Sequence, residues 1–86
     1  MRFQGAVIRE QGVTFGVVIV KSHVLQNSFE ADRMISALMP AFPGMPVVLM
    51  AQDYRGVPTY YGRRDISRFM AGVPLRCVPW REYTLS

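Results

Sequence analysis

Residues 13–52, VTFGVVIVKSHVLQNSFEADRMISALMPAFPGMPVVLMAQ, decide the fold because they predict a strand, a helix and a second strand in succession. The first segment, 13–21, is rich in β-branched residues, and the last, 45–52, is short and apolar at consecutive positions. Continuous apolar runs are typical of strands that are covered on both faces. Two strands joined through a helix are expected to run parallel with a right-handed connection. This unit therefore predicts a parallel pair of strands inside the sheet.

The helix between these strands is marked by its ends and by its period. Asn27 or Ser28 can cap its start, and Glu30 stands three residues after Asn27, as in a capping box. Pro40 is expected to stop the helix. Six apolar residues follow the i, i+3, i+4, i+7 spacing and give the helix one face to bury: Ala31, Met34, Ile35, Leu38, Met39 and Phe42.

On the N-terminal side of this unit, residues 2–9 predict another strand. Gly12 can adopt the positive φ of a tight turn, so that strand is expected to pair with 13–21 as an antiparallel hairpin.

On the C-terminal side, three further segments are predicted. Residues 56–62 (GVPTYYG) form either a short strand or an ordered loop. Residues 63–72 predict a second helix, capped by Gly72 and ended by Pro74, with one apolar face: Ile66, Phe69, Met70 and Val73. Residues 75–85 predict a last strand that contains Cys77, and Pro79 within it favours a sheet edge or a bulge.

The order is therefore β-β-α-β-(β)-α-β, a hairpin followed by two crossover units in one small α+β or α/β domain over residues 1–86. We expect a mixed sheet of four or five strands with two helices. Two short helices can barely cover one face of such a sheet. Either they lie on opposite faces, or one face is buried against a second copy of the chain. With 50 % apolar residues, the composition favours a homodimer.

The charge of the chain is compatible with acidic partners. The net charge is +4, and nine of the ten basic residues are arginine, whose planar fork suits phosphate and carboxylate. A GC-rich genome gives the same arginine excess without selection for binding.

The sequence has one cysteine and one histidine, which limits the kinds of metal site and disulfide that it can form. Cys77 is the only cysteine and His23 the only histidine, which excludes disulfide frameworks and zinc ribbons, and we predict no cofactor or metal. The start of the sequence lacks the pattern of a signal peptide, and the longest nearly apolar run, 13–20, is far shorter than a membrane span. A cytoplasmic protein without a membrane partner is expected.

A first candidate site lies at the ends of the two strands in residues 13–52. Ligands prefer the crevice beyond the carboxyl ends of parallel strands. That crevice would gather residues 21–23 from one strand end and residues 52–55 from the other, with Lys21, Ser22, His23 and Asp53 as its candidate site residues. A histidine near an aspartate can act as a general base, with Ser22 as nucleophile and Lys21 as anion stabiliser. Alternatively, Asp53 is a turn residue and His23 a loop residue without chemistry.

A second candidate site is the stretch 53–69, DYRGVPTYYGRRDISRF, with four arginines and three tyrosines. Its candidate residues for anion or nucleic-acid binding are Arg55, Tyr60, Tyr61, Arg63, Arg64 and Arg68. If a helix begins near Gly62, its free amides and the two adjacent arginines can hold a phosphate, and the adjacent tyrosines can stack a base. Alternatively, Asp65 caps the helix, the arginines are solvated, and the tyrosines are strand residues at the edge of the core.

Three functions follow from these features. The first is a non-enzymatic binding or structural module, acting as a homodimer or as a subunit of a larger assembly. The second is binding of an anion or nucleic acid through residues 54–68. The third is a small-molecule enzyme that uses residues 21–23 and 53.

Overall fold

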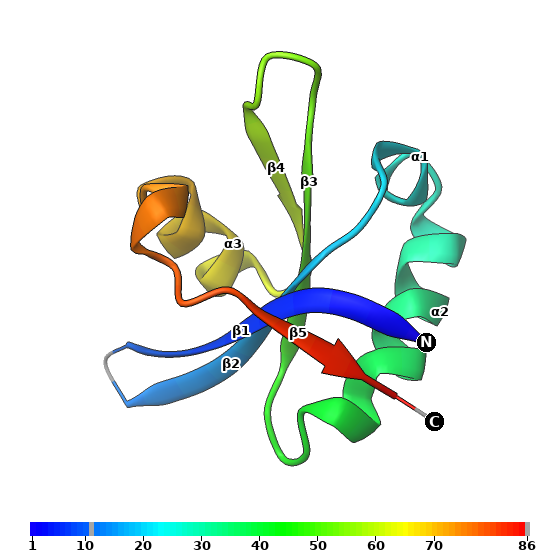
Figure 1. Cartoon of the computed structure of the whole chain (residues 1–86), viewed down its shortest axis with the longest axis vertical. Coiled ribbons are helices and arrows are strands. Elements are labelled where there is room, and N and C mark those ends of the chain that lie inside the picture. Colours follow the sequence, from blue (N-terminus) through cyan, green and yellow to red (C-terminus); the bar gives the residue numbers. More distant parts are fainter. Residues whose placement is uncertain (11, 86) are drawn as a thin grey trace.

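A computed structural model describes residues 1–10 and 12–85, which form one mixed sheet flanked by helices (Figure 1). The strands are β1 (Arg2–Glu10), β2 (Val13–Ile19), β3 (Val47–Gln52), β4 (Pro58–Tyr61) and β5 (Arg81–Thr84). The helices are α1 (Ser22–Leu25), α2 (Ser28–Leu38) and α3 (Arg64–Ala71), with 3₁₀ turns at Met39–Ala41 and Leu75–Cys77. The strand order is β4-β3-β2-β1-β5, and the predicted mixed α+β fold is confirmed.

The unit that decides the fold has the predicted geometry. β2 and β3 run parallel, with Gly16 opposite Val47 and Ile19 opposite Met50. β1 and β2 form the predicted antiparallel hairpin. β2 ends at Ile19, two residues earlier than expected, because Lys21 already caps the short helix α1.

The predicted start and end of α2 are confirmed. Asn27 has an extended backbone, and its side chain accepts a hydrogen bond of 3.1 Å from the amide of Glu30. The α-helix ends at Leu38, and the chain continues through a 3₁₀ turn that contains Pro40. This extra turn carries Phe42 back onto the sheet, where its side chain is buried.

Phe42 packs against two glycines of the sheet. A Cβ atom at Gly16 would lie 2.6 Å from the Phe42 ring, and one at Gly5 would lie 3.3 Å from it. The rings of Phe3 and Tyr83 surround Phe42, with ring centroids 6.1 and 5.1 Å from its own. The missing side chains at the two glycines therefore make the space that this aromatic cluster fills.

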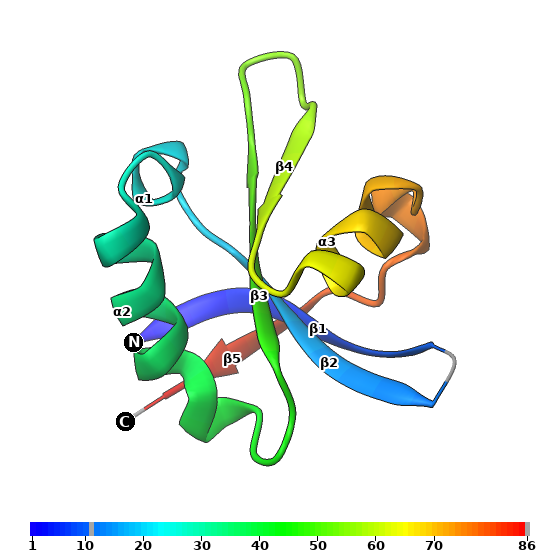
Figure 2. The ribbon, with the colours of Figure 1, turned by 180° about the vertical axis from the view of Figure 1, so that it is seen from behind.

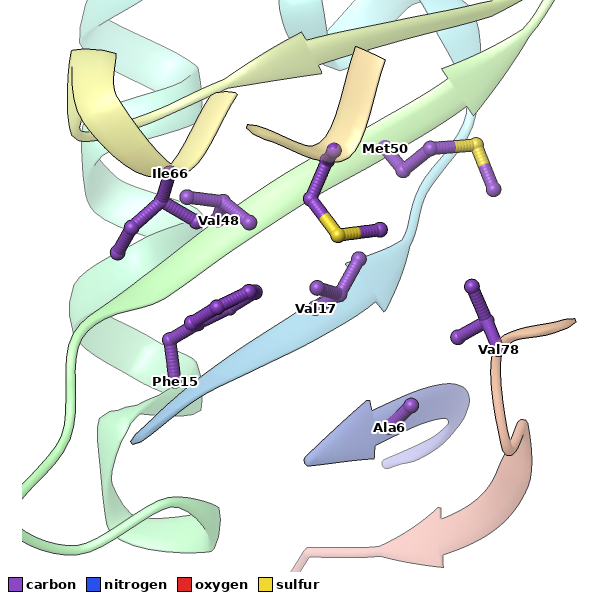
Figure 3. Packing of buried hydrophobic residues seen from close by; sticks show 8 residues of the cluster. Ala6, Phe15, Val17, Val48, Met50, Ile66 and Val78 are labelled. Carbon is purple, nitrogen blue, oxygen red and sulfur yellow. The ribbon is translucent and has the colours of Figure 1, made fainter. Parts of the chain in front are cut away.

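The helices lie on opposite faces of the sheet (Figures 1 and 2). Because side chains alternate along a strand, β2 and β3 supply both cores. The α2 core contains Val18, Val24, Ala31, Leu38, Phe42, Val47 and Leu49. The α3 core contains Ala6, Phe15, Val17, Val48, Met50, Ile66, Met70 and Val78 (Figure 3).

This arrangement is one of the two predicted alternatives. The central residues of β2 and all of β3 except Gln52 are buried within a single chain. These two strands therefore need no second copy to cover them. A homodimer has to rest on other apolar surface.

The predicted second parallel crossover is wrong. β4 returns from β3 as an antiparallel neighbour, whereas β5 pairs with β1 at the opposite edge of the sheet. From the pairings, β4 and β5 point in opposite directions. The reason is the short connection 53–57 between β3 and β4, which is long enough only for a hairpin. The strand that leads into α3 therefore runs opposite to β3.

The predicted strand 75–85 is also wrong over its first half. Leu75–Cys77 is a 3₁₀ turn, Cys77 is exposed, and the strand begins only at Arg81. Pro79 has no amide hydrogen for a ladder. Trp80 instead donates from Nε1 to the carbonyl of Leu75 at 3.1 Å, which folds this segment across the α3 core.

The described helices are short. The longest, α2, has 11 residues, and none in residues 1–10 and 12–85 has the length and apolar character to cross a bilayer.

Candidate functional site

The crevice beyond β2 and β3 brings Ser22 close to the end of β3. The Ser22 hydroxyl donates to the carbonyl of Gln52 at 3.1 Å. Ser22 and Asp53 line a cavity of about 270 Å³, together with Leu25, Gln26, Ala51 and Thr59. This cavity has exposed polar groups on its wall, and it lies where the rule for parallel strands places a ligand.

The other two residues of the predicted crevice lie elsewhere. Lys21 and His23 line a different hollow, and His23 Nε2 is 3.8 Å from Glu30 Oε1. The short helix α1 causes this separation, because consecutive helical residues differ in direction by about 100°. Ser22 and His23 therefore face different cavities.

Asp53 is occupied by its own turn. Its Oδ1 accepts from the amides of Arg55 and Val57 at 2.8 and 2.9 Å. A carboxylate held in this way serves the backbone of the turn, as the alternative interpretation of the sequence described. The structure thus does not bring His23 and Asp53 together into one catalytic group.

The adjacent tyrosines of β4 lie on opposite faces of the sheet. Tyr60 packs against the α3 core, where burial raises the pKa of its phenol. Tyr61 lies on the α2 side, and its hydroxyl donates to Asp32 Oδ1 at 2.8 Å, which together with burial raises the pKa of this phenol. Because neighbours in a strand point apart, these two rings do not form one stacking platform.

The start of α3 is filled by the chain's own carboxylate. Arg63 donates to both oxygens of Asp65, from Nε at 2.9 Å and from Nη2 at 2.7 Å. These hydrogen bonds, with help from the amide of Ile66, lower the pKa of the Asp65 carboxyl to about 2. Arg63 and Arg64 therefore do not converge on an open anion pocket.

Arg64 and Arg68 are exposed one turn apart on α3, opposite the buried Ile66 and Met70. In the part of the chain that the structure describes, neither arginine forms a salt bridge. They form a solvated basic strip.

The turn between β3 and β4 presents the remaining arginine of the predicted site. Tyr54 is 91 % exposed, and the guanidinium carbon of Arg55 lies 5.4 Å from the centroid of its ring. Five hydrogen bonds fix this turn, which we call the β3–β4 tip (residues 53–57). They are the two to Asp53 Oδ1, two between backbone groups of 53–57, and one from Gln52 Nε2 to the carbonyl of Gly56.

A second surface, which the sequence analysis did not identify, lies beside α2. Two adjoining hollows of about 430 and 530 Å³ share Met1, Glu30 and Met34. We call them together the α2 groove. Apolar side chains dominate the first hollow: Phe3, Val18, Val20, Val24, Met34 and Leu38.

Phe29 stands at the rim of the α2 groove and is 70 % exposed. A sequence signal for it exists. Phe29 precedes Ala31 by two residues, which places it on the side of the helix away from the buried stripe. A large aromatic residue outside that stripe indicates an exposed contact.

Comparison of the chain with family models, curated proteins and solved structures finds no match. Any function must therefore be argued from the surfaces described above. Among residues 1–10 and 12–85, no three His, Cys, Asp or Glu side chains are grouped so that they could hold a metal ion.

Proposed function

We propose that this protein is a non-enzymatic module that self-associates as a homodimer through the α2 groove. The observation that carries the proposal is the position of Phe29, a largely exposed aromatic ring beside an open apolar hollow. Large contiguous apolar patches on a protein surface mark sites of interaction with a partner. The groove is one place where the described residues leave such surface uncovered.

A second copy is the occupant that the groove favours. A two-fold interface uses the same patch on both subunits, so the patch must be complementary to itself. Here an exposed ring, Phe29, and an adjoining apolar hollow of about 430 Å³ lie on one surface. In a two-fold pair, each Phe29 would enter the hollow of the other copy.

The charged side chains at the rim of the groove would also be complementary between two copies related by a two-fold axis. Glu30 lies at the groove together with Lys21 and Arg33, neither of which forms a salt bridge within the described residues. Rotation by a two-fold axis can set the carboxylate of one copy against a cation of the other. A stable interface needs roughly 800 Å² from each partner, which is about one-seventh of the 5723 Å² surface of this chain.

The cytoplasm is the compartment that we propose. Cys77 is exposed as a free thiol, and such thiols persist in a reducing environment. No catalytic role is proposed for Lys21, Ser22, His23 and Asp53, since two of them face the α2 groove and the other two face a separate cavity.

Sedimentation equilibrium at micromolar concentrations tests the homodimer. We expect the wild-type protein to sediment as a dimer and Phe29→Glu to sediment as a monomer. An aromatic residue at the centre of an interface contributes about 2 kcal/mol or more, so the dissociation constant should rise at least ~30-fold. Tyr54→Glu is the matched control, because it places the same charge on another exposed aromatic position, outside the groove.

Two results would overturn the proposal. One is a wild-type chain that remains a monomer at the highest soluble concentration. The other is a dimer that Phe29→Glu leaves intact, or that Tyr54→Glu weakens as strongly as Phe29→Glu does.

A further inference from the structure

We infer that the β3–β4 tip is a contact site for single-stranded nucleic acid, in which Tyr54 stacks on a base and Arg55 contacts a backbone phosphate. This inference is independent of the proposed dimer, because the tip shares no residue with the α2 groove.

The side chain of Tyr54 is almost fully exposed. At 91 %, it is the most exposed of the large apolar side chains described, and its ring contributes little to either core. Its ring thus offers a flat π surface to the solvent. Base stacking on such a ring is worth about 1–3 kcal/mol and tolerates any base.

The β3–β4 tip is held in one conformation by hydrogen bonds within the turn. Asp53 Oδ1 holds the amides of Arg55 and Val57, and Gly56 has the positive φ of 83° that closes the turn. A tyrosine side chain has only two torsions to fix. Binding at this position therefore costs little conformational entropy, which favours a contact site over a merely solvated loop.

A positive charge lies beside the Tyr54 ring. The guanidinium of Arg55 lies near the ring of Tyr54, and it forms no salt bridge among the described residues. The nearest carboxylate in sequence, that of Asp53, accepts hydrogen bonds from two amides of the turn. An aromatic ring next to an available guanidinium matches a ligand with a flat base and an adjacent phosphate.

A single strand fits this site better than a duplex does. Bases in a duplex already stack on one another, whereas a single strand can place one base on an exposed ring. The net charge of +4, with the basic strip Arg64 and Arg68, would attract such a strand over a longer range. The cavity that adjoins the tip at Asp53 also carries Gln26 and Thr59, whose side chains can supply hydrogen bonds to a neighbouring nucleotide.

Fluorescence anisotropy with a labelled oligothymidine of about 15 nucleotides tests the stacking step. We expect the wild type and Tyr54→Phe to bind at low salt with similar affinity. Tyr54→Leu keeps an apolar side chain but removes the aromatic face, so it should bind about 10-fold more weakly. Because the Tyr54 ring packs in neither core, all three proteins should have the same thermal midpoint.

The salt dependence of binding tests the phosphate contact. Each phosphate contact with a single strand contributes about 0.7 to the slope of log K against log salt. Arg55→Gln should reduce the slope by roughly this amount. Arg81→Gln is the matched control, since Arg81 is also exposed and its guanidinium carbon lies 5.8 Å from the centroid of the Tyr83 ring, on a surface outside the α2 groove.

Three results would overturn the inference. No binding of the oligonucleotide at low salt would exclude the tip as a site for single-stranded nucleic acid. Equal affinity of Tyr54→Leu and the wild type would exclude stacking. An equal change of slope for Arg55→Gln and Arg81→Gln would assign the attraction to net charge alone.

Discussion

At the scale of single residues, Gly16 decides how closely α2 and its following turn approach the sheet. Phe42 occupies the space that a side chain at position 16 would need, with a ring carbon 2.6 Å from an added Cβ. Phe42 is itself 1 % exposed and lies among other rings, so it has little room to move. A methyl group at this position must displace the ring or the strand.

We predict that Gly16→Ala lowers the free energy of unfolding by about 1–3 kcal/mol, the usual cost of overpacking a core. Gly72→Ala should instead raise the free energy of unfolding. Its φ of −96° suits alanine, and the nearest atom to an added Cβ is 3.7 Å away. The gain, from a less flexible unfolded chain, is about 0.4–1 kcal/mol.

Urea denaturation of the two variants measures both effects. Equal stabilities for Gly16→Ala and Gly72→Ala would contradict the contact between Phe42 and the sheet.

Residue patterns predicted some of these positions and not others. Asn27 was identified as a cap because capping depends only on local chemistry. The packing of Phe42 on Gly16 was not predicted, since it joins residues from a turn and a strand that are far apart in sequence. His23 was misplaced in the expected crevice because the four residues of α1 carry no periodic signal of their own.

At the scale of elements, α3 has an ion pair at its start. Asp65 lies in the first turn, where a negative charge is favourable, and it also binds Arg63 through two hydrogen bonds. The pKa of its carboxyl falls from 3.8 to about 2 on folding. A lowered pKa means that the folded state prefers the ionised form.

The stability from this pair is therefore fully present above about pH 4 and is lost as the pH falls through about 2. We predict that the difference in thermal midpoint between wild type and Asp65→Asn is constant from neutral pH down to about pH 4. It should then shrink as the pH approaches 2. Scanning calorimetry at low salt measures the difference, because salt screens an exposed pair.

A difference that persists undiminished at about pH 2 would contradict the role of the Asp65 carboxylate. A difference in thermal midpoint that disappears already above about pH 5 would also contradict this role.

The errors at this scale come from contacts that the sequence does not display. Val78 and Trp80 have strand propensity, but the bond from Trp80 to the carbonyl of Leu75 bends their segment over the α3 core. Tertiary packing here overrides local preference. The β3–β4 hairpin, in contrast, had a signal, since Asp53 and Gly56 form a turn too short for a crossover.

At the scale of the whole molecule, the sheet has a protected centre and two open edges. β2 and β3 are paired on both sides and buried on both faces, whereas β4 and β5 have four residues each and one neighbour. Edge strands open more easily than central ones.

We predict that amides in Val13–Ile19 and Val47–Gln52 exchange with deuterium roughly 100-fold more slowly than those of Arg81–Thr84. Native-state hydrogen exchange followed by NMR at low protein concentration measures this ratio. Equal protection of β5 and β2 would contradict the order of strands.

The class of the fold followed from one strand-helix-strand unit, because apolar periodicity is a local property. The order of all five strands did not, since several orders satisfy the same pattern. The α2 groove was not predicted either, because it combines side chains of β1, β2, α1 and α2, among them Phe3, Val18 and Val24. A surface assembled from four elements in this way has no signature in any one of them.

The pairing of β1 with β5 sets the order in which the protein can fold. β1 and β5 lie side by side (Figure 1). Arg2 lies opposite Thr84, and Met1 and Leu85 exchange hydrogen bonds of 2.7 Å. Closing a loop of that length costs roughly 4 kcal/mol of chain entropy if it happens first. The hairpin and the parallel pair can form at lower cost, so β5 should dock late, onto an edge that is already built. Substitutions in β5 should then accelerate unfolding and leave the rate of folding almost unchanged.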